Sequence, residues 1–83
     1  MPIVNSLGLH ARPAAEFVKT SARFQSNVVV RKDGLEVNGK SIMGMMMLAA
    51  ERGSELYIRA EGDDAEAALA ALVALVAAGF GEQ

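Results

Sequence analysis

The apolar residues of this chain recur with two different periods. Between Ala11 and about Ala22 they lie three or four positions apart, which is typical of a helix that buries one face. The run Val28 to Val30 is β-branched, and from Leu56 to Glu61 apolar and polar residues alternate, as in half-buried strands. Asp33-Gly34 favours a tight hairpin turn, because both central positions of such a turn take positive φ. The valine run and the segment Leu35 to Val37 are therefore predicted to pair as a hairpin.

Three further elements follow from local signals. Pro2 to Asn5 is predicted to form a short strand. Ser41 can cap a short helix that runs to about Ala50, because its hydroxyl can accept a hydrogen bond from the first turn. Asp63 and Glu66 resemble a capping box at the start of a third helix. That helix has one predicted apolar stripe and a predicted terminating glycine, namely Leu69, Leu72, Val73, Val76 and Phe80 for the stripe and Gly79 or Gly81 for the end.

The order of these elements, β-α-β-β-α-β-α, predicts an α+β fold. The simplest way to bury all the apolar faces together is a four-stranded antiparallel sheet with three helices on one face, an open-faced β-sandwich. The other face of the sheet would be solvated, which suits Arg31, Glu36 and Arg59. With 83 residues and no internal linker, residues 1–83 are expected to form one domain.

Composition excludes several classes of protein. Hydrophobic residues make up 52% of the chain, too many for a disordered segment. There is no cysteine and only one histidine, so we expect no disulfide framework and no metal or other cofactor. The N-terminus lacks the pattern of a signal peptide, and the last helix begins with acids and is too short to span a bilayer. A cytoplasmic protein without membrane insertion is the expectation.

Charge is unevenly distributed along the chain. Residues 1–60 hold all eight Lys and Arg with five acids, whereas residues 61–83 hold the other five acids and no base. The basic part is expected to meet an anionic group or partner. Nucleic acid would require a denser basic patch with aromatic residues, and the chain has one Tyr, three Phe and no Trp.

The segment around His10 carries the most specific chemistry. His10 directly precedes the first predicted helix, whose initial N–H groups lack partners within the helix and carry its positive pole. Such a terminus is a ready site for an anion. Arg12 adds a planar cation that can grip phosphate oxygens, and Pro13 stiffens the first turn where an N–H is not needed. Gly8 allows the turn to present the imidazole outward. A nucleophile that holds a phosphoryl group is one interpretation; a surface or capping histidine is the other.

Three blocks resemble one known family. Leu7 to Ala14 is similar to the active-site signature of HPr, the histidine-containing phosphocarrier of the bacterial sugar phosphotransferase system. Val37 to Met46 resembles the regulatory-serine segment of that family, and Gly79 to Glu82 resembles its ending. The resemblance implies that enzyme I, charged from phosphoenolpyruvate, phosphorylates His10 on the ring nitrogen nearer the backbone. Enzyme II domains of sugar permeases would then receive the phosphoryl group, with Arg12 steadying it in both transfers.

The resemblance gives Ser41 a second role beside capping. In some members a serine kinase, opposed by a phosphatase, phosphorylates this residue, and a transcriptional regulator can read the product. New negative charge at Ser41 would then slow transfer to His10. The N-terminus is shorter than is common in the family, so the first strand is expected to be clipped, and Met47 replaces a residue that is often small and polar.

The methionine-rich segment after Ser41 is too apolar for one buried face. A helix cannot bury five successive positions against one sheet, and exposed methionines suit docking to several partners. We assign Met45 and Leu48 to the core. The predicted docking surface consists of Ile42, Met43 and Met46, with Lys19 and Arg23 steering acidic partners.

Several alternatives stay open at this stage. A purely regulatory relative that acts through Ser41 would tend to lack His10 and Arg12, which are both present. A specialised paralogue, for example in a nitrogen-related branch, also fits the residues. A phosphohistidine enzyme would need a second catalytic histidine and a pocket, and a domain that binds nucleic acid or a small ligand is disfavoured by charge and aromatic content. A monomer is expected, because no long apolar stripe should remain exposed.

Overall fold

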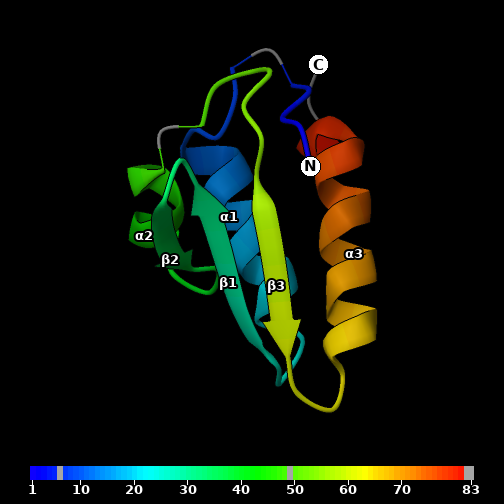
Figure 1. Cartoon of the computed structure of the whole chain (residues 1–83). Coiled ribbons are helices and arrows are strands. Elements are labelled where there is room, and N and C mark those ends of the chain that lie inside the picture. Colours follow the sequence, from blue (N-terminus) through cyan, green and yellow to red (C-terminus); the bar gives the residue numbers. More distant parts are fainter. Residues whose placement is uncertain (6, 49, 82–83) are drawn as a thin grey trace.

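The computed structural model describes residues 1–5, 7–48 and 50–81. Figure 1 shows a sheet with helices packed behind it. The elements in chain order are α1 (Ala11–Ser21), β1 (Asn27–Lys32), β2 (Leu35–Asn38), α2 (Ile42–Met47), β3 (Tyr57–Glu61), α3 (Ala65–Ala77) and a final 3-10 turn, Gly79–Gly81. The predicted helices and the hairpin are all found.

The sheet has the order β2-β1-β3, and both pairs are antiparallel. Val30 lies at its centre, opposite Val37 on one side and Ile58 on the other. The turn between β1 and β2 has positive φ at both Asp33 (51°) and Gly34 (83°), as the hairpin prediction requires. With this register, the apolar side chains of the sheet lie on one face, which packs against the helices.

The predicted fourth strand is not found in the described part of the chain. Only Pro2 forms a β-bridge, with Glu55. Met1 and Leu56 exchange two backbone hydrogen bonds of 2.8 Å, and the N–H of Ile3 donates to the carbonyl of Ser54. These contacts lie before the start of β3 rather than alongside it, because the segment pairs with residues 53–56 and then turns inward to bury Ile3. The sheet thus has three strands and one flanking bridge.

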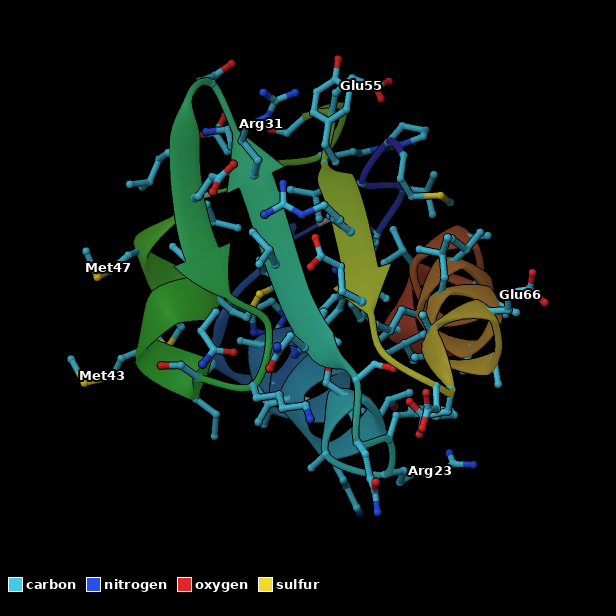
Figure 2. The ribbon with its side chains drawn as sticks, turned by 60° about the horizontal axis from the view of Figure 1, so that its bottom comes forward. Arg23, Arg31, Met43, Met47, Glu55 and Glu66 are labelled. Atoms are coloured by element: carbon cyan, nitrogen blue, oxygen red, sulfur yellow. The ribbon has the colours of Figure 1, made fainter. Side chains whose placement is uncertain are left out.

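All three helices cover the same face of the sheet. In Figure 2, α2 lies behind the β2 edge of the sheet and α3 beside the β3 edge, with α1 between them on the same face. The other face is open to solvent and polar, as predicted. There the Arg59 guanidinium lies 3.8 Å from the Glu36 carboxylate and 3.3 Å from that of Glu61, and Arg31 stacks 4.9 Å above the Tyr57 ring. The open-faced arrangement is therefore confirmed.

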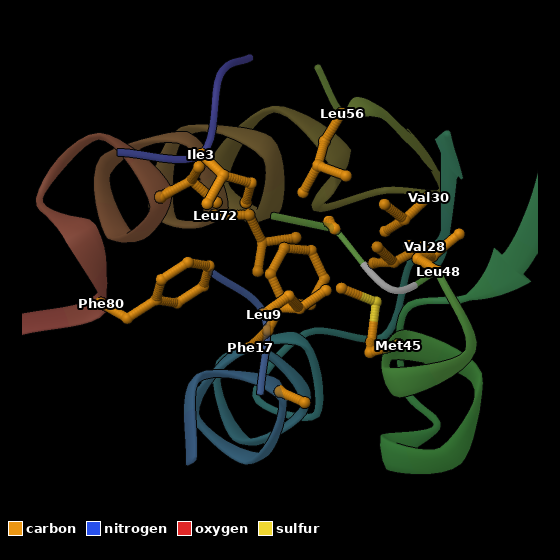
Figure 3. Packing of buried hydrophobic residues seen from close by; sticks show 13 residues of the cluster. Ile3, Leu9, Phe17, Val28, Val30, Met45, Leu48, Leu56, Leu72 and Phe80 are labelled. Atoms are coloured by element: carbon orange, nitrogen blue, oxygen red, sulfur yellow. The ribbon is translucent and has the colours of Figure 1, made fainter. Parts of the chain in front are cut away.

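The core lies between the sheet and the helices (Figure 3). Phe17 of α1 is fully buried among side chains that come from every layer. The buried apolar cluster consists of Ile3, Leu9, Ala14, Phe17, Val28, Val30, Met45, Leu48, Ala50, Leu56, Leu72, Val76 and Phe80. Met45 and Leu48 are core residues, as predicted. Truncating Phe17 to alanine would cost about 3–5 kcal/mol on the usual scale for such side chains.

The start of α3 differs from the predicted capping box. Its N-cap is Asp64, not Asp63, and the Asp64 side chain makes no cap hydrogen bond. Its carboxylate instead accepts hydrogen bonds from the N–H of Gln25 at 2.8 Å, the N–H of Ser26 at 2.9 Å and the Ser26 hydroxyl. The capping-box prediction is wrong, because this carboxylate clamps the loop after α1 to α3.

The apolar stripe of α3 also differs from the prediction in part. Leu72, Val76 and Phe80 are buried as expected, but the third buried position of the helix is Ala68. Leu69 and Val73 are each 37% exposed. Ala68, Leu72 and Val76 are four residues apart and lie on one side of the helix, so Ala68 is buried although it is less apolar than Leu69. The helix ends before Gly79, as predicted.

Candidate functional site

The loop that carries His10 is fixed by tertiary contacts. Leu9 is buried in the core, and its N–H donates to the carbonyl of Ala50 at 2.8 Å. The buried side chain of Asn5 donates through Nδ2 to the carbonyl of Gly8 at 2.8 Å, and the N–H of Gly8 donates to the carbonyl of Asn5 at 3.2 Å. These bonds determine where the chain enters α1 and hence where His10 lies.

Gly8 is required here for two independent reasons. Its φ is +66°, a conformation that other residues rarely adopt. A Cβ at this position would lie 2.5 Å from the carbonyl oxygen of Ala50 and 2.9 Å from the Cα of Glu51. The backbone after α2 therefore packs directly against Gly8, a close approach that the sequence did not reveal.

His10 is the N-cap residue of α1 and is half-buried. Its backbone is extended (φ −87°, ψ −170°), and its carbonyl accepts the first helical hydrogen bond from Ala14 at 3.0 Å. Its side chain makes no cap hydrogen bond to the helix. The imidazole thus lies beside the positive pole of α1 and does not cap the helix. This is the geometry expected of a helix N-terminus that accepts an anion.

The cations of α1 follow the same side of the helix. Arg12 and Lys19 are both exposed and are separated by seven residues, which is two helical turns. Pro13 is buried in the first turn, where it contributes no N–H. The structure therefore places positive charge next to His10 and again two turns along α1, with the half-buried Glu16 between the two cations on the same side.

Ser41 caps α2 as predicted. Its Oγ accepts a hydrogen bond of 3.0 Å from the N–H of Gly44. The helix ends at Met47, earlier than the predicted end near Ala50, and the carbonyl of Ala50 accepts a hydrogen bond from Leu9 of the His10 loop. The structure thereby joins the end of α2 to the loop that carries His10.

The three residues of α2 that were assigned to docking are all exposed. Ile42 and Met46 are exposed, and Met43 is 75% exposed. Met47, at 64%, belongs to the same surface. Figure 2 shows Met43 and Met47 pointing away from the sheet into solvent. Because α2 packs beside α1, this apolar surface adjoins the basic side of α1.

A family model described as the PTS HPr component phosphorylation site matches residues 1–78. The chain belongs to the PTS HPr family. It is 48% identical over 80 residues to the phosphocarrier protein HPr of Neisseria meningitidis, covering 96% of this chain and 90% of that one. It is 52% identical over 69 residues to the HPr-like protein Crh of Bacillus subtilis, covering 83% of this chain and 81% of that protein.

A solved structure with the same fold is that of HPr-C-His from Thermoanaerobacter tengcongensis. Its TM-score is 0.95 at 51% identity, and the match covers 100% of this chain and 93% of that one. The predicted membership of the HPr family is therefore confirmed. The family consists of phosphocarriers of the phosphotransferase system and not of catalytic enzymes.

Sequence reasoning overlooked one apolar residue near the site of this HPr-family chain. Leu7 is 75% exposed, three residues before His10. The only signal in the sequence was a leucine within the predicted turn that leads to His10. It adds an exposed apolar side chain to the loop that carries His10.

The described residues also limit other kinds of site. Within them, no helix is long and apolar enough to cross a membrane. The same part of the chain contains no group of three or more His, Cys, Asp or Glu side chains placed to hold a metal ion.

Proposed function

We propose that His10 accepts a phosphoryl group from enzyme I and passes it to enzyme II domains of sugar permeases. The observation that carries this proposal is the position of His10 as the N-cap of α1, two residues before the exposed Arg12 of the first turn. In the forward step the ring nitrogen nearer the backbone forms a bond to phosphorus, and the bond between phosphorus and the donor breaks. The second step reverses this on the acceptor. Membership of the HPr family supports both partners.

Intact mass spectrometry tests the acceptor residue. The protein is incubated with enzyme I and phosphoenolpyruvate, with His10→Ala as the matched variant. We expect one acid-labile phosphoryl group on the wild type and none on the variant. An unmodified wild type with a validated enzyme I would contradict the proposal. It would favour a paralogue with another donor, or a regulator that acts through Ser41.

Arg12 is proposed to hold the transferring phosphoryl group. It lies two residues after His10 and is exposed at the positive end of α1. A guanidinium can bind two phosphoryl oxygens at once, whereas an ammonium is a point charge. Arg12→Ala should lower the transfer rate by about 10²–10³, the usual effect of losing one such donor. Arg12→Lys should restore only part of the rate. Equal transfer rates for the wild type, Arg12→Ala and Arg12→Lys would show that Arg12 does not hold the phosphoryl group.

Ile42, Met43, Met46 and Lys19 are proposed to form the docking surface for both partners. The three apolar side chains are exposed on α2, and Lys19 is exposed on the neighbouring α1. Met46→Ser should raise the KM of enzyme I for this protein with little change in kcat, because the substitution removes a binding contact and leaves the chemical step unaffected. Leu69→Ser on α3 is the matched control, since this leucine is similarly exposed but lies on the opposite side of the molecule.

Ser41 is proposed as a regulatory phosphorylation site for a serine kinase and phosphatase, with a transcriptional regulator as a reader. Its hydroxyl is half-buried at the start of α2, next to Ile42 of the docking surface. A phosphate there adds negative charge to a surface that meets its partner through apolar and basic residues. Ser41→Asp should therefore slow phosphorylation of His10, whereas Ser41→Asn, which keeps the cap without charge, should not. Equal rates for the two variants would contradict the regulatory role.

A further inference from the structure

The carbonyl oxygen of Gly8 accepts two hydrogen bonds, one from a residue before it in the chain and one from a residue after it. Nδ2 of the Asn5 side chain donates to this oxygen at 2.8 Å, and the backbone N–H of His10 donates to it at 3.1 Å. A carbonyl oxygen has two lone pairs, so these two donors satisfy it. One oxygen atom thus joins the Asn5 side chain to the backbone of His10.

The peptide group between Gly8 and Leu9 is held at both of its ends. Its C=O accepts the bond from Asn5, and its N–H, which belongs to Leu9, donates to the carbonyl of Ala50 at 2.8 Å. A peptide group is planar, so hydrogen bonds at its two ends together fix its rotation. Glycine restricts this rotation less than any other residue, and the constraint must therefore come from outside the turn. The fixed peptide group sets the direction in which the chain continues to His10.

Asn5 is itself held in place from two sides. It is buried, with 1% of its surface exposed. Two residues earlier, the N–H of Ile3 donates to the carbonyl of Ser54 at 2.8 Å, and the carbonyl of Ile3 accepts from the N–H of Gly53 at 2.7 Å. The chain after α3 also packs against Asn5, since a Cβ on Gly79 would lie 3.5 Å from the Cβ of Asn5. The Asn5 amide is therefore anchored independently of the turn that it holds.

We propose that Asn5 is a positioning residue for phosphoryl transfer, because its amide fixes the Gly8–Leu9 peptide group and thereby the place of His10 at the start of α1. The inference rests on the proposed role of His10 as the phosphoryl acceptor. Transfer requires the ring nitrogen to meet the phosphorus in line, and a misplacement of about 1 Å can lower such a rate by about 10²-fold. Asn5 acts through the backbone, so the docking residues of α1 and α2 should keep their places without it.

Single-turnover transfer from phosphorylated enzyme I separates positioning from binding. Asn5→Ala removes the donor to Gly8 and should lower the maximal transfer rate by about 10–100-fold. The half-saturating concentration should stay within about twofold of the wild-type value, because the docking surface is unchanged. This is the opposite of the pattern expected for Met46→Ser. Asn5→Leu, which has nearly the shape of asparagine and suits a buried position, is the second variant and should show the same pattern if Asn5→Ala is too unstable to assay.

Ser26→Ala is the matched structural control. Ser26 is similarly buried, at 2% exposed, and its hydroxyl also makes a hydrogen bond, to Asp64, but it lies beyond the far end of α1. Its loss should lower the melting temperature and leave the maximal transfer rate unchanged. A wild-type maximal rate in the Asn5 variants, a change in half-saturation alone, or an equal fall of the rate in Ser26→Ala would overturn the inference. Failure of the proposed function would look different, because the wild type itself would then carry no phosphoryl group on His10.

Discussion

Both α1 and α2 begin at an N-cap residue with an extended backbone, but the two N-cap side chains are used differently. At α2, the Ser41 hydroxyl accepts a hydrogen bond from the N–H of Gly44, so the protein itself satisfies that terminus. At α1 the corresponding residue is His10, and its side chain makes no such bond. The start of α2 is capped by its own N-cap side chain, whereas the start of α1 lies beside the side chain of His10, the proposed phosphoryl acceptor.

The two termini are also held in different ways. α2 depends on a local cap, which any short polar side chain could supply. α1 depends on tertiary contacts of the preceding loop: buried Leu9, the Asn5 side chain bonded to the carbonyl of Gly8, and Gly8 packed on Ala50. A terminus without a cap needs such external support, so substitutions at the two starts should have unequal effects.

The largest effect is expected at Gly8. Gly8→Ala combines a strained positive φ with a clash against backbone, and should lower the free energy of unfolding by about 2–5 kcal/mol. Gly34→Ala is the matched control, because Gly34 also has positive φ (83°) but nothing lies within 4 Å of its Cβ position. Gly34→Ala should lower the free energy of unfolding only by the cost of the strained positive φ. Urea denaturation measures both, and equal losses would show that contact with Ala50 is unimportant.

Loss of the cap at α2 should have a moderate effect. Ser41→Ala removes the hydrogen bond to Gly44 and should cost about 1 kcal/mol of unfolding free energy. The rate at which enzyme I phosphorylates His10 should change little, because the cap belongs to another helix. Thermal denaturation and phosphorylation kinetics measure the two quantities. A large fall in the phosphorylation rate of a stably folded Ser41→Ala protein would show that the starts of α1 and α2 do not act independently.

Adding a cap at α1 should have a smaller effect of opposite sign. His10→Ser should be more stable than His10→Ala by about 0.5–1 kcal/mol, since only serine can close the terminus. Comparing the two variants removes the effect of losing the imidazole itself. Both should fail to carry a phosphoryl group. If His10→Ser were no more stable than His10→Ala, the first turn of α1 would have no N–H group that a serine hydroxyl can cap.

The smallest effect is expected at Asp64, whose carboxylate lies at the surface. The hydrogen bond from the Ser26 hydroxyl, followed by that from the Gln25 N–H, holds the pKa of this carboxyl below its usual value of 3.8. A depressed folded-state pKa stabilises the protein above pH 3.8, and this contribution is lost as the pH falls through the lower value. Asp64→Asn should therefore lose part of the acid dependence of stability. Asp63→Asn, its neighbour, is the control and should keep it.

Local signals predicted those parts of the fold that local forces decide. The Asp33-Gly34 hairpin and the Ser41 cap need only a few consecutive residues, and both are found. Pro2 to Asn5 was predicted to form a short strand, but only Pro2 forms a bridge, because the pairing depends on residues 53–56, far away in sequence.

The errors in α3 have a related cause. An almost uniformly apolar helix gives no direction to its buried face, so Leu69 and Val73 could not be distinguished from Ala68. Two adjacent acids, Asp63 and Asp64, were equally suited to cap it, and contact with Ser26 decided between them. For the candidate site, the motif identified His10 and Arg12, but the support of Gly8 by Ala50 became visible only in three dimensions.

The central claim is that the open start of α1 receives the phosphoryl group carried by His10. Backbone amide NMR before and after addition of enzyme I and phosphoenolpyruvate tests it most directly. In the wild type the amide resonances in the first turn of α1 should move strongly, and that of Gly44 in α2 should stay in place. In His10→Ala none of these resonances should move. A phosphorylated His10 that leaves the α1 amides unmoved, or moves Gly44 as much, would contradict the account.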